Sequence, residues 1–295
     1  MVLLKSGAMT EVTYAKLDDR SLLKISGDDR TDFLQNLISN DLGQLSADKA
    51  IYSALLTPQG KFLFDFFLMD FGDYLLLDCE KSRSADLIKR LTMYKLRSAV
   101  EIEDISDALS VFGIFDKNPG SDITPPDNLD GKLVADPRLS ALGYRLYTSG
   151  SSIDHLEEAD EGAYRHHRFA LGVPEGSEDI QPEKNFLLEA NFEELNGVSF
   201  SKGCYIGQEL TARTKFRAKI KKRLFKFEYD GDLSAGDLIS SNEKEIAKVV
   251  SFSKPYGLAM TRLDAFGSLS PTPELSPAGL RLTKPDYVIL SEKED

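Results

Sequence analysis

Residues 202–209, Lys-Gly-Cys-Tyr-Ile-Gly-Gln-Glu, combine residue types that could do thiol chemistry. Cys204 lies beside Lys202 and just ahead of a segment that can begin a helix. A nearby ammonium group and the positive end of a helix dipole both favour the thiolate form of a cysteine. Gly203 and Gly207 permit backbone turns and the close approach of a ligand or partner. A tight turn with a small, buried and inert cysteine in its floor fits the same pattern equally well.

A basic run follows this segment directly. Its cations occupy every second position, at Arg213, Lys215, Arg217, Lys219 and Lys221, with Phe216, Ala218 and Ile220 among the residues between them. As a strand, the run would place the cations on one face and the apolar residues on the other. One interpretation is that the cations bind an anion, and the carboxylates of a small ligand are favoured over a phosphate backbone. The alternative is a solvated edge strand that uses Lys and Arg to block edge-to-edge pairing.

Two carboxylates are further candidates. Glu189 follows the apolar run 186–188. A carboxylate at the end of a strand could accept paired N–H donors from a heterocycle such as a pterin, but it is also a common solvated strand end. Asp65 stands among four phenylalanines between residues 62 and 67. It is either a partly buried acid with a raised pKa or a residue on a solvated face of its strand.

The sequence predicts no metal site. Its two cysteines, Cys79 and Cys204, lie far apart, which argues against a disulfide framework and favours a reducing compartment. His166 and His167 are adjacent in a helical stretch, so their rings point about 100° apart and do not chelate a metal together. We read both as structural or exposed. No glycine-rich phosphate loop or Ser-His-Asp arrangement stands out.

Length and composition are those of an ordinary globular protein. A chain of 295 residues suggests about two domains, and 41% of its residues are hydrophobic and 28% charged. No segment approaches the roughly 18 apolar residues of a membrane span. The first residues are too weakly basic for a signal or transit peptide, and Met9 is a candidate natural start. The net charge of −12 argues against general affinity for nucleic acid.

The elements that must position these groups fall into two parts. Up to residue 221, hairpins and helices mix without strict alternation of strand and helix, which predicts an α+β body. The expected strands lie near 22–27, 52–56, 62–71, 74–79, 111–115 and 144–147, and the expected helices near 29–38, 84–93 and 154–171, with an exposed loop over 116–137. From residue 222 onwards, short strands near 224–229, 246–250 and 257–260 predict a small antiparallel β-barrel or sandwich.

The segment from Lys202 to Arg213 closely resembles the signature of the YgfZ-type folate-binding proteins. These are relatives of the glycine-cleavage T-protein, an aminomethyltransferase, and they act in the assembly or repair of iron–sulfur clusters. The resemblance covers most of the chain, through blocks near 27–41, 56–65, 136–143 and 164–179. It implies a T-protein-like ring of subdomains around a central tetrahydrofolate pocket over residues 10–221. The small barrel over residues 222–295 would pack at one side.

The resemblance also implies roles for single residues. Cys204 would be the redox or ligand-exchange residue, with Lys202 beside it, and Glu189 falls where T-protein relatives place a carboxylate that recognises the pterin. Asp65 lies where the aminomethyltransferases carry a pair of acids, although Phe64 precedes it here, so catalysis of methyl transfer is in question. The remaining expected folate contacts are Tyr205, Gln208, Glu209 and Arg213.

The leading hypothesis is a tetrahydrofolate-binding accessory protein that builds or maintains iron–sulfur clusters, particularly [4Fe–4S] clusters, on client or scaffold proteins. Since a cluster normally needs about four protein ligands, one thiol must share it with a partner. The alternative is a folate-dependent aminomethyltransferase. A third hypothesis is a folate-dependent partner in RNA modification that uses the basic run. The expected location is the cytoplasm of a bacterium or the mitochondrial matrix of a eukaryote.

Overall fold

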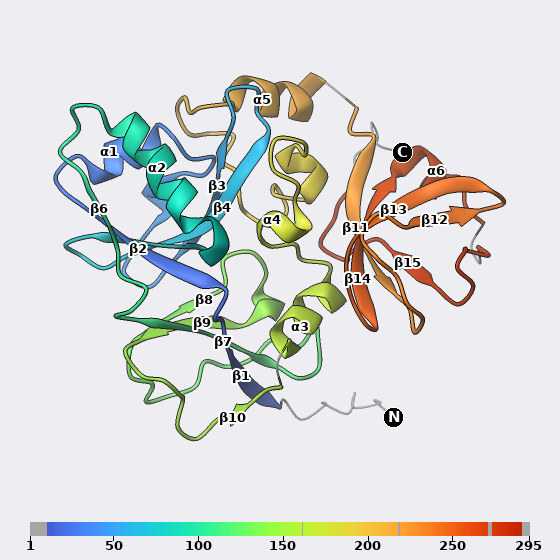
Figure 1. Cartoon of the computed structure of the whole chain (residues 1–295), viewed down its shortest axis with the longest axis horizontal. Coiled ribbons are helices and arrows are strands. Elements are labelled where there is room, and N and C mark those ends of the chain that lie inside the picture. The colour runs from blue at the N-terminus through green and yellow to red at the C-terminus, as the bar shows by residue number, and fades with distance from the viewer. Residues whose placement is uncertain (1–10, 161, 218, 271–272, 291–295) are drawn as a thin grey trace, which may run out of the picture.

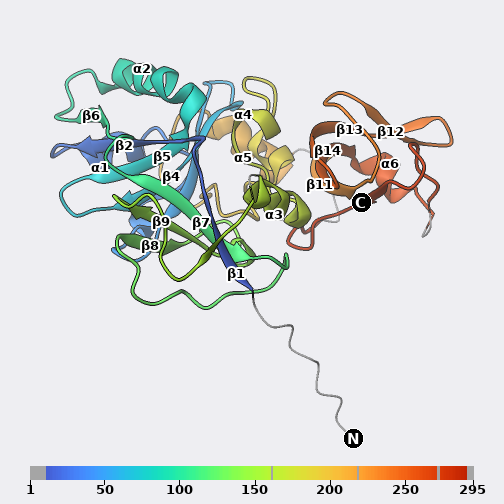
Figure 2. The same ribbon diagram turned by 60° about the horizontal axis from the view of Figure 1, so that its bottom comes forward.

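A computed structural model of the chain describes residues 11–160, 162–217, 219–270 and 273–290. Figures 1 and 2 show a body built on two sheets and, beside it, a third sheet that curls into a small barrel. The candidate start at Met9 and the first residue of the predicted body domain lie outside the described residues. Within the described ranges, no helix is both long enough and apolar enough to cross a bilayer.

The first sheet of the body is antiparallel and has the strand order β3-β4-β5-β2-β6. Its strands are β2 (Arg20–Ser26), β3 (Ile51–Leu56), β4 (Phe62–Asp70), β5 (Leu75–Glu80) and β6 (Glu101–Asp104). Side chains of β4 alternate between two cores, with Phe67 and Met69 in one and Phe66 and Leu68 in the other. Because both faces of the sheet are covered, β4 is a nearly continuous apolar run.

Two helices pack against one face of the first sheet, α1 (Arg30–Gln35) and α2 (Ser84–Lys95). Leu87 and Leu91, spaced by four residues on α2, are fully buried in the same core as Leu34 of α1. The predicted helix over 84–93 is confirmed. The turns η1 (Leu42–Gln44) and η2 (Lys81–Arg83) connect these helices to the sheet.

The second sheet of the body has the strand order β10-β1-β7-β9-β8. Its strands are β1 (Val12–Lys16), β7 (Ser110–Asp116), β8 (Lys132–Ala135), β9 (Tyr144–Thr148) and β10 (Glu157–Glu158). Two predictions are corrected here. The span 116–137 is not all loop, because it contains β8, which pairs with β9. The helix predicted over 154–171 begins only at α3 (Ala163–Leu171), because β10 pairs in parallel with β1. The turn η3 (Ser140–Leu142) precedes β9.

The third sheet has the strand order β12-β13-β14-β11-β15 and forms the barrel. Its elements are β11 (Lys222–Glu228), β12 (Leu238–Ser241), β13 (Lys244–Ser253), β14 (Tyr256–Arg262), α6 (Leu263–Gly267) and β15 (Arg281–Thr283). The three strands predicted from residue 222 onwards correspond to β11, β13 and β14. Figure 1 shows α3, α4 (Gly176–Asp179) and α5 (Gln208–Arg217) between the body and the barrel.

The basic run is not a strand, which corrects the prediction. Arg213, Lys215 and Arg217 lie on α5, and Lys219 and Lys221 lie in the link that follows it. Residues two apart on a helix point in nearly opposite directions, so the run presents no single cationic face. The pair Glu209 and Arg213, four residues apart with the acid first, is a sequence feature that favours the helix.

Candidate functional site

Cys204 is exposed, whereas Cys79 is buried. Cys204 lies in the turn that leads into α5, and its neighbour Tyr205 is 7% exposed and belongs to the main core. Gly207 holds this turn close to the turn between β3 and β4. Its φ is +82°, and a Cβ there would lie 2.6 Å from the carbonyl oxygen of Thr57, so only glycine fits without strain.

Burial raises the pKa of the Cys79 thiol to about 12, so this sulfur stays protonated and out of reach. Of the two cysteines, Cys204 is therefore the one that can react with or bind an external group. The alternative of a buried cysteine at position 204 is wrong.

Lys202 does not face the thiol. Its ammonium group donates hydrogen bonds to the carbonyl oxygens of Gln35 at 2.7 Å, Ile38 at 2.8 Å and Asn40 at 2.7 Å. Burial lowers the pKa of Lys202 to about 8. All three N–H donors are thus used, and Lys202 fixes the Cys204 segment to the chain that follows α1. This corrects the prediction that its ammonium promotes the thiolate of Cys204.

Replacing Lys202 with methionine should lower the free energy of unfolding by about 3 kcal/mol. Hydrogen bonds to a charged group contribute roughly 1.5–3 kcal/mol, and the variant leaves buried carbonyl groups without a donor. Urea unfolding measures the change, and Lys89→Met, at an exposed position of α2, is the matched control. Equal, small losses in both variants would show that the three hydrogen bonds do not anchor the segment.

Glu189 lines a cavity of about 660 Å³ at the junction of the body and the barrel. It lies in the turn η4 (Leu187–Ala190), which corrects the prediction that it ends a strand. Its Oε2 accepts the N–H of Phe186 at 3.0 Å, and its Oε1 lies 3.7 Å from the ammonium of Lys222. The wall contains the apolar side chains of Phe186, Ile220 and Leu263 and the cations Lys219, Lys221, Lys222 and Arg262.

The residues that line this cavity include groups that could hold a folate. Its volume lies in the range of about 300–1,000 Å³ typical of small-molecule sites. A carboxylate can accept the N–H groups of a pterin, an aromatic side chain can pack on its ring, and cations can meet the glutamyl carboxylates. Of the residues predicted to contact a ligand, Glu189 lines this cavity, and so do Lys219 and Lys221 of the basic run that was expected to meet carboxylates.

The other predicted folate contacts do not line this cavity and lie on α5 or just before it. Tyr205 is in the core, Gln208 opens α5, and Glu209 and Arg213 are exposed. Thr214, from the second half of α5, does line the cavity. Six residues of helix rise about 9 Å, so the Cys204 turn and the Glu189 cavity lie towards opposite ends of α5.

Asp65 is a buried acid, one of the two interpretations that the sequence left open. It is 2% exposed, and its Oδ2 accepts hydrogen bonds from the Tyr52 hydroxyl at 2.8 Å and the Gly176 N–H at 3.0 Å. Burial raises the pKa of Asp65, and the nearby Arg20 opposes that shift. A carboxyl group so deeply buried offers no open face to a ligand, and the structure does not bring it to the Glu189 cavity.

Six buried charged side chains fill the space between the two sheets of the body. We call them the charge cluster; its members are Arg20, Asp78, Asp136, Arg138, Arg145 and Glu175. Asp78 accepts hydrogen bonds from Arg20 at 2.7 Å and Arg145 at 2.9 Å, and these join β5 to β2 and to β9 of the other sheet. Glu175 accepts from Arg138 at 2.6 Å. The arginines hold the pKa values of Asp78 and Glu175 below their usual range against the opposing effect of burial.

The charge cluster was not predicted from the sequence. One signal was available, because Asp78 interrupts an apolar strand and Arg145 lies within another. Charged residues are almost never fully buried unless they are paired. Which carboxylate meets which guanidinium depends on how the two sheets face each other.

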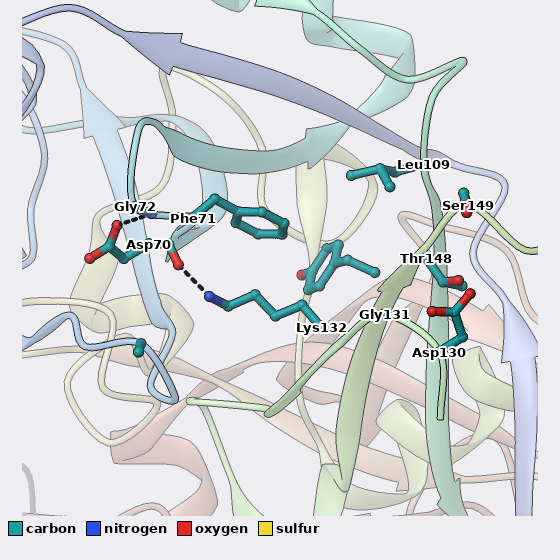
Figure 3. Close-up of a pocket in the computed structure, with 11 residues that line it drawn as sticks. Asp70, Phe71, Gly72, Leu109, Asp130, Gly131, Lys132, Thr148 and Ser149 are labelled. Carbon is teal, nitrogen blue, oxygen red and sulfur yellow. Dashed lines mark hydrogen bonds between the residues drawn. The ribbon is translucent and has the colours of Figure 1, made fainter. Parts of the chain in front are cut away.

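A second cavity, of about 560 Å³, opens beside the turn between β4 and β5. Figure 3 shows Lys132 reaching from β8 to the carbonyl oxygen of Asp70. The ammonium of Lys132 lies 4.7 Å from the centroid of the Phe71 ring. None of the predicted site residues is among the described residues that line this cavity.

Comparison with known proteins identifies relatives for both parts of the chain. The family described as CAF17, C-terminal beta-barrel domain, matches residues 221–288. The mitochondrial iron-sulfur cluster assembly factor IBA57 of Mus musculus is 36% identical over 245 residues, which are 76% of this chain and 68% of that protein. The corresponding Homo sapiens protein is 35% identical over 230 residues, or 71% of this chain and 64% of that protein. The chain thus spans about two thirds of these relatives.

A solved structure shows the same fold. The glycine cleavage system aminomethyltransferase T from Bartonella henselae superimposes with a TM-score of 0.71 over 95% of this chain and 87% of that chain. At 13% identity this likeness concerns the fold alone. The predicted fold class, an α+β T-protein-like body with a small C-terminal β-barrel, is confirmed.

Proposed function

This chain belongs to the family of the iron–sulfur cluster assembly factor IBA57, and we propose that it helps to build or maintain iron–sulfur clusters on other proteins through Cys204. The observation that carries the proposal is the exposed thiol in a turn anchored by Lys202 and Tyr205. A fixed backbone presents the sulfur to a partner, while the second cysteine is sealed in the core.

A cluster handled here is cargo shared with a partner. Among the described residues, no group of three or more His, Cys, Asp or Glu side chains could hold a metal ion. A cluster normally takes about four protein ligands, so Cys204 would supply one and a client or scaffold protein the others. A single ligand permits exchange, because the cluster leaves when the partner's ligands replace one sulfur.

Tetrahydrofolate is the proposed small-molecule ligand, as in the related YgfZ-type proteins. When bound, it supplies a reduced pteridine that can carry a one-carbon unit. Glu189 would accept the pterin N–H groups, Phe186 would pack on the ring, and the cations after α5 would meet the glutamyl carboxylates. Because the Cys204 turn and this cavity lie towards opposite ends of α5, the proposal does not place the folate against the sulfur.

Replacing Glu189 with glutamine should raise the Kd for tetrahydrofolate roughly 10- to 100-fold, because charge-assisted hydrogen bonds contribute about 1.5–3 kcal/mol. Anaerobic isothermal titration calorimetry measures the affinity. Glu209→Gln is the matched control, since Glu209 is exposed on α5 outside the cavity, and it should bind as the wild type does. Loss of affinity in the Glu209 variant alone would place the ligand at the other end of α5.

The two alternatives receive less support from the geometry. An aminomethyltransferase would need its catalytic carboxyl group beside the ligand. Asp65 is instead buried, and its carboxyl group accepts hydrogen bonds from Tyr52 and Gly176. An RNA-binding strand would need its cations on one face. Instead the run is mostly helical, and Lys215 pairs with Glu193.

Reconstitution in vitro tests the proposed function directly. A cluster-loaded scaffold protein and a client lacking its [4Fe–4S] cluster are mixed with and without this chain, and client activity is followed. We expect the chain to accelerate the recovery of activity. Recovery at the same rate without the chain would overturn the proposal. The relatives are named as mitochondrial proteins, and a mitochondrial or bacterial cytoplasmic location for this chain stays a prediction.

A further inference from the structure

A cavity beside α3, lined also by residues of β7, β10 and β14, takes no part in the proposed function. Its volume is about 370 Å³, within the range typical of small-molecule sites. We call its buried lining residues Phe115, near the end of β7, and His167, on α3, the floor, and its exposed lining residues the rim; the half-buried Tyr256 of the barrel also lines it. Neither Cys204 nor Glu189 is among its lining residues.

The floor holds a buried acceptor without a partner. His167 is 3% exposed, and its Nε2 lies 2.8 Å from the carbonyl oxygen of Ala141. Because a carbonyl oxygen only accepts, we assign the proton to Nε2, which leaves a lone pair on Nδ1. Burial lowers the pKa of His167, which favours this neutral form.

Within the described part of the chain, Nδ1 of His167 is buried and has no hydrogen-bond partner. Ala141, whose carbonyl oxygen takes the other nitrogen, is not among the residues that line the cavity, whereas His167 is. A buried polar atom without a partner is unfavourable. A donor N–H from a bound molecule would satisfy it.

The walls and the rim differ in chemistry. The ring of Phe115 lies 4.9 Å from that of His167, centroid to centroid, and provides a flat apolar wall. Three exposed carboxylates, Glu157, Glu158 and Asp160, stand at the rim against one cation, Lys117, which pairs with Glu157 at 2.7 Å. The rim is therefore negative and the floor is uncharged.

We propose that this cavity binds a small aromatic amine, whose ring N–H donates to Nδ1 of His167 while its ammonium group lies among the carboxylates of the rim. A neutral N–H suits the floor, because a charged group would lose its hydration there. A flat ring packs well beside Phe115 and Tyr256. The ammonium group stays partly solvated and is attracted electrostatically by the carboxylates of the rim.

Tryptamine is the probe for this site. The chain contains no tryptophan, so exciting the indole at the long-wavelength edge of its absorption, where tyrosine does not absorb, lets its fluorescence anisotropy report binding without a protein background. We expect saturable binding of tryptamine. 1-Methyltryptamine, which lacks the ring N–H, should bind about tenfold more weakly, and indole-3-propionate, which reverses the charge, more weakly still. No saturable binding, or equal binding of the three compounds, would overturn the proposal.

Variants test the same contacts from the protein side. The double substitution of Glu158→Gln with Asp160→Asn should raise the Kd for tryptamine and reduce its salt dependence. Glu103→Gln, an exposed change on β6, is the control and should have no effect. His167→Phe keeps the aromatic volume but removes the acceptor and the bond to Ala141, so its Tm is measured as well. A folded His167→Phe variant that binds tryptamine normally would refute the role of Nδ1.

Discussion

Replacing Cys204 with serine should abolish the acceleration of cluster assembly on client proteins while the fold and the affinity for tetrahydrofolate stay unchanged. The thiolate is the ligand and nucleophile in cysteine chemistry, and a serine hydroxyl does not ionise at neutral pH to replace it. The side chain is exposed, and surface substitutions usually change stability by no more than about 0.5 kcal/mol. The reconstitution assay with an apo [4Fe–4S] client measures the loss, and circular dichroism checks the fold.

Cys79→Ala is the matched control for this experiment. It removes the only other thiol of the chain, which is buried in the core between the first sheet and its helices. The variant should lose some stability through the cavity it creates but keep full activity in cluster assembly. Full activity of Cys204→Ser would remove the thiol from the mechanism, and loss of activity in both variants at equal Tm would point to a role for both sulfurs.

Replacing Asp78 with asparagine should lower the free energy of unfolding by about 3–5 kcal/mol. The change leaves the guanidinium groups of Arg20 and Arg145 without their shared carboxylate. Removing one partner of a buried ion pair costs about 3–5 kcal/mol, because the other charge stays buried without compensation. Such a loss is large against a total stability of roughly 5–15 kcal/mol. Urea unfolding at pH 7 measures it, with Asp86→Asn on the exposed side of α2 as the control.

The same variant should change the pH dependence of stability. The pKa values of Asp78 and Glu175 are lowered in the folded protein. Their contribution to the free energy of unfolding is therefore fully present above the ordinary carboxyl pKa of about 4. It is lost as the pH falls through their lowered pKa values in the folded protein. The Asp78→Asn variant should lose less additional stability on acidification than the wild type. A difference between the two proteins that stays constant from neutral to acid pH would contradict this account.

Much of the fold follows from local pattern. The alternation and length of the apolar runs predicted β4, β5, β7 and β9, the helical spacing of Leu87 and Leu91 predicted α2, and the change of texture near residue 222 predicted the barrel. The errors arose where a short segment was compatible with both the two-residue period of a strand and the 3.6-residue period of a helix. Cations at every second position suggested a strand, but the pair Glu209 and Arg213 and the buried Thr211 suit the helix that forms.

The role of Lys202 could not be predicted from its neighbours in the chain. Sequence proximity suggested an ion pair with the Cys204 thiolate. The ammonium instead donates to three carbonyl groups more than 160 residues away. Leaving buried carbonyl groups without a donor is unfavourable, whereas water can solvate an exposed sulfur. Burial and partners decide such a choice, and both are properties of the folded chain.

Residue types and spacing alone identified Cys204 as a candidate residue, the turn and the helix start beside it, the two-part organisation and the family resemblance, because these depend on neighbours along the chain. Tertiary structure alone decided that Asp65 is sealed, that Glu189 opens on the junction with the barrel, and that six charges meet between two sheets. Those arrangements join residues distant in sequence, and their energies depend on burial and on the distance between charges. Neither quantity exists until the sheets have packed.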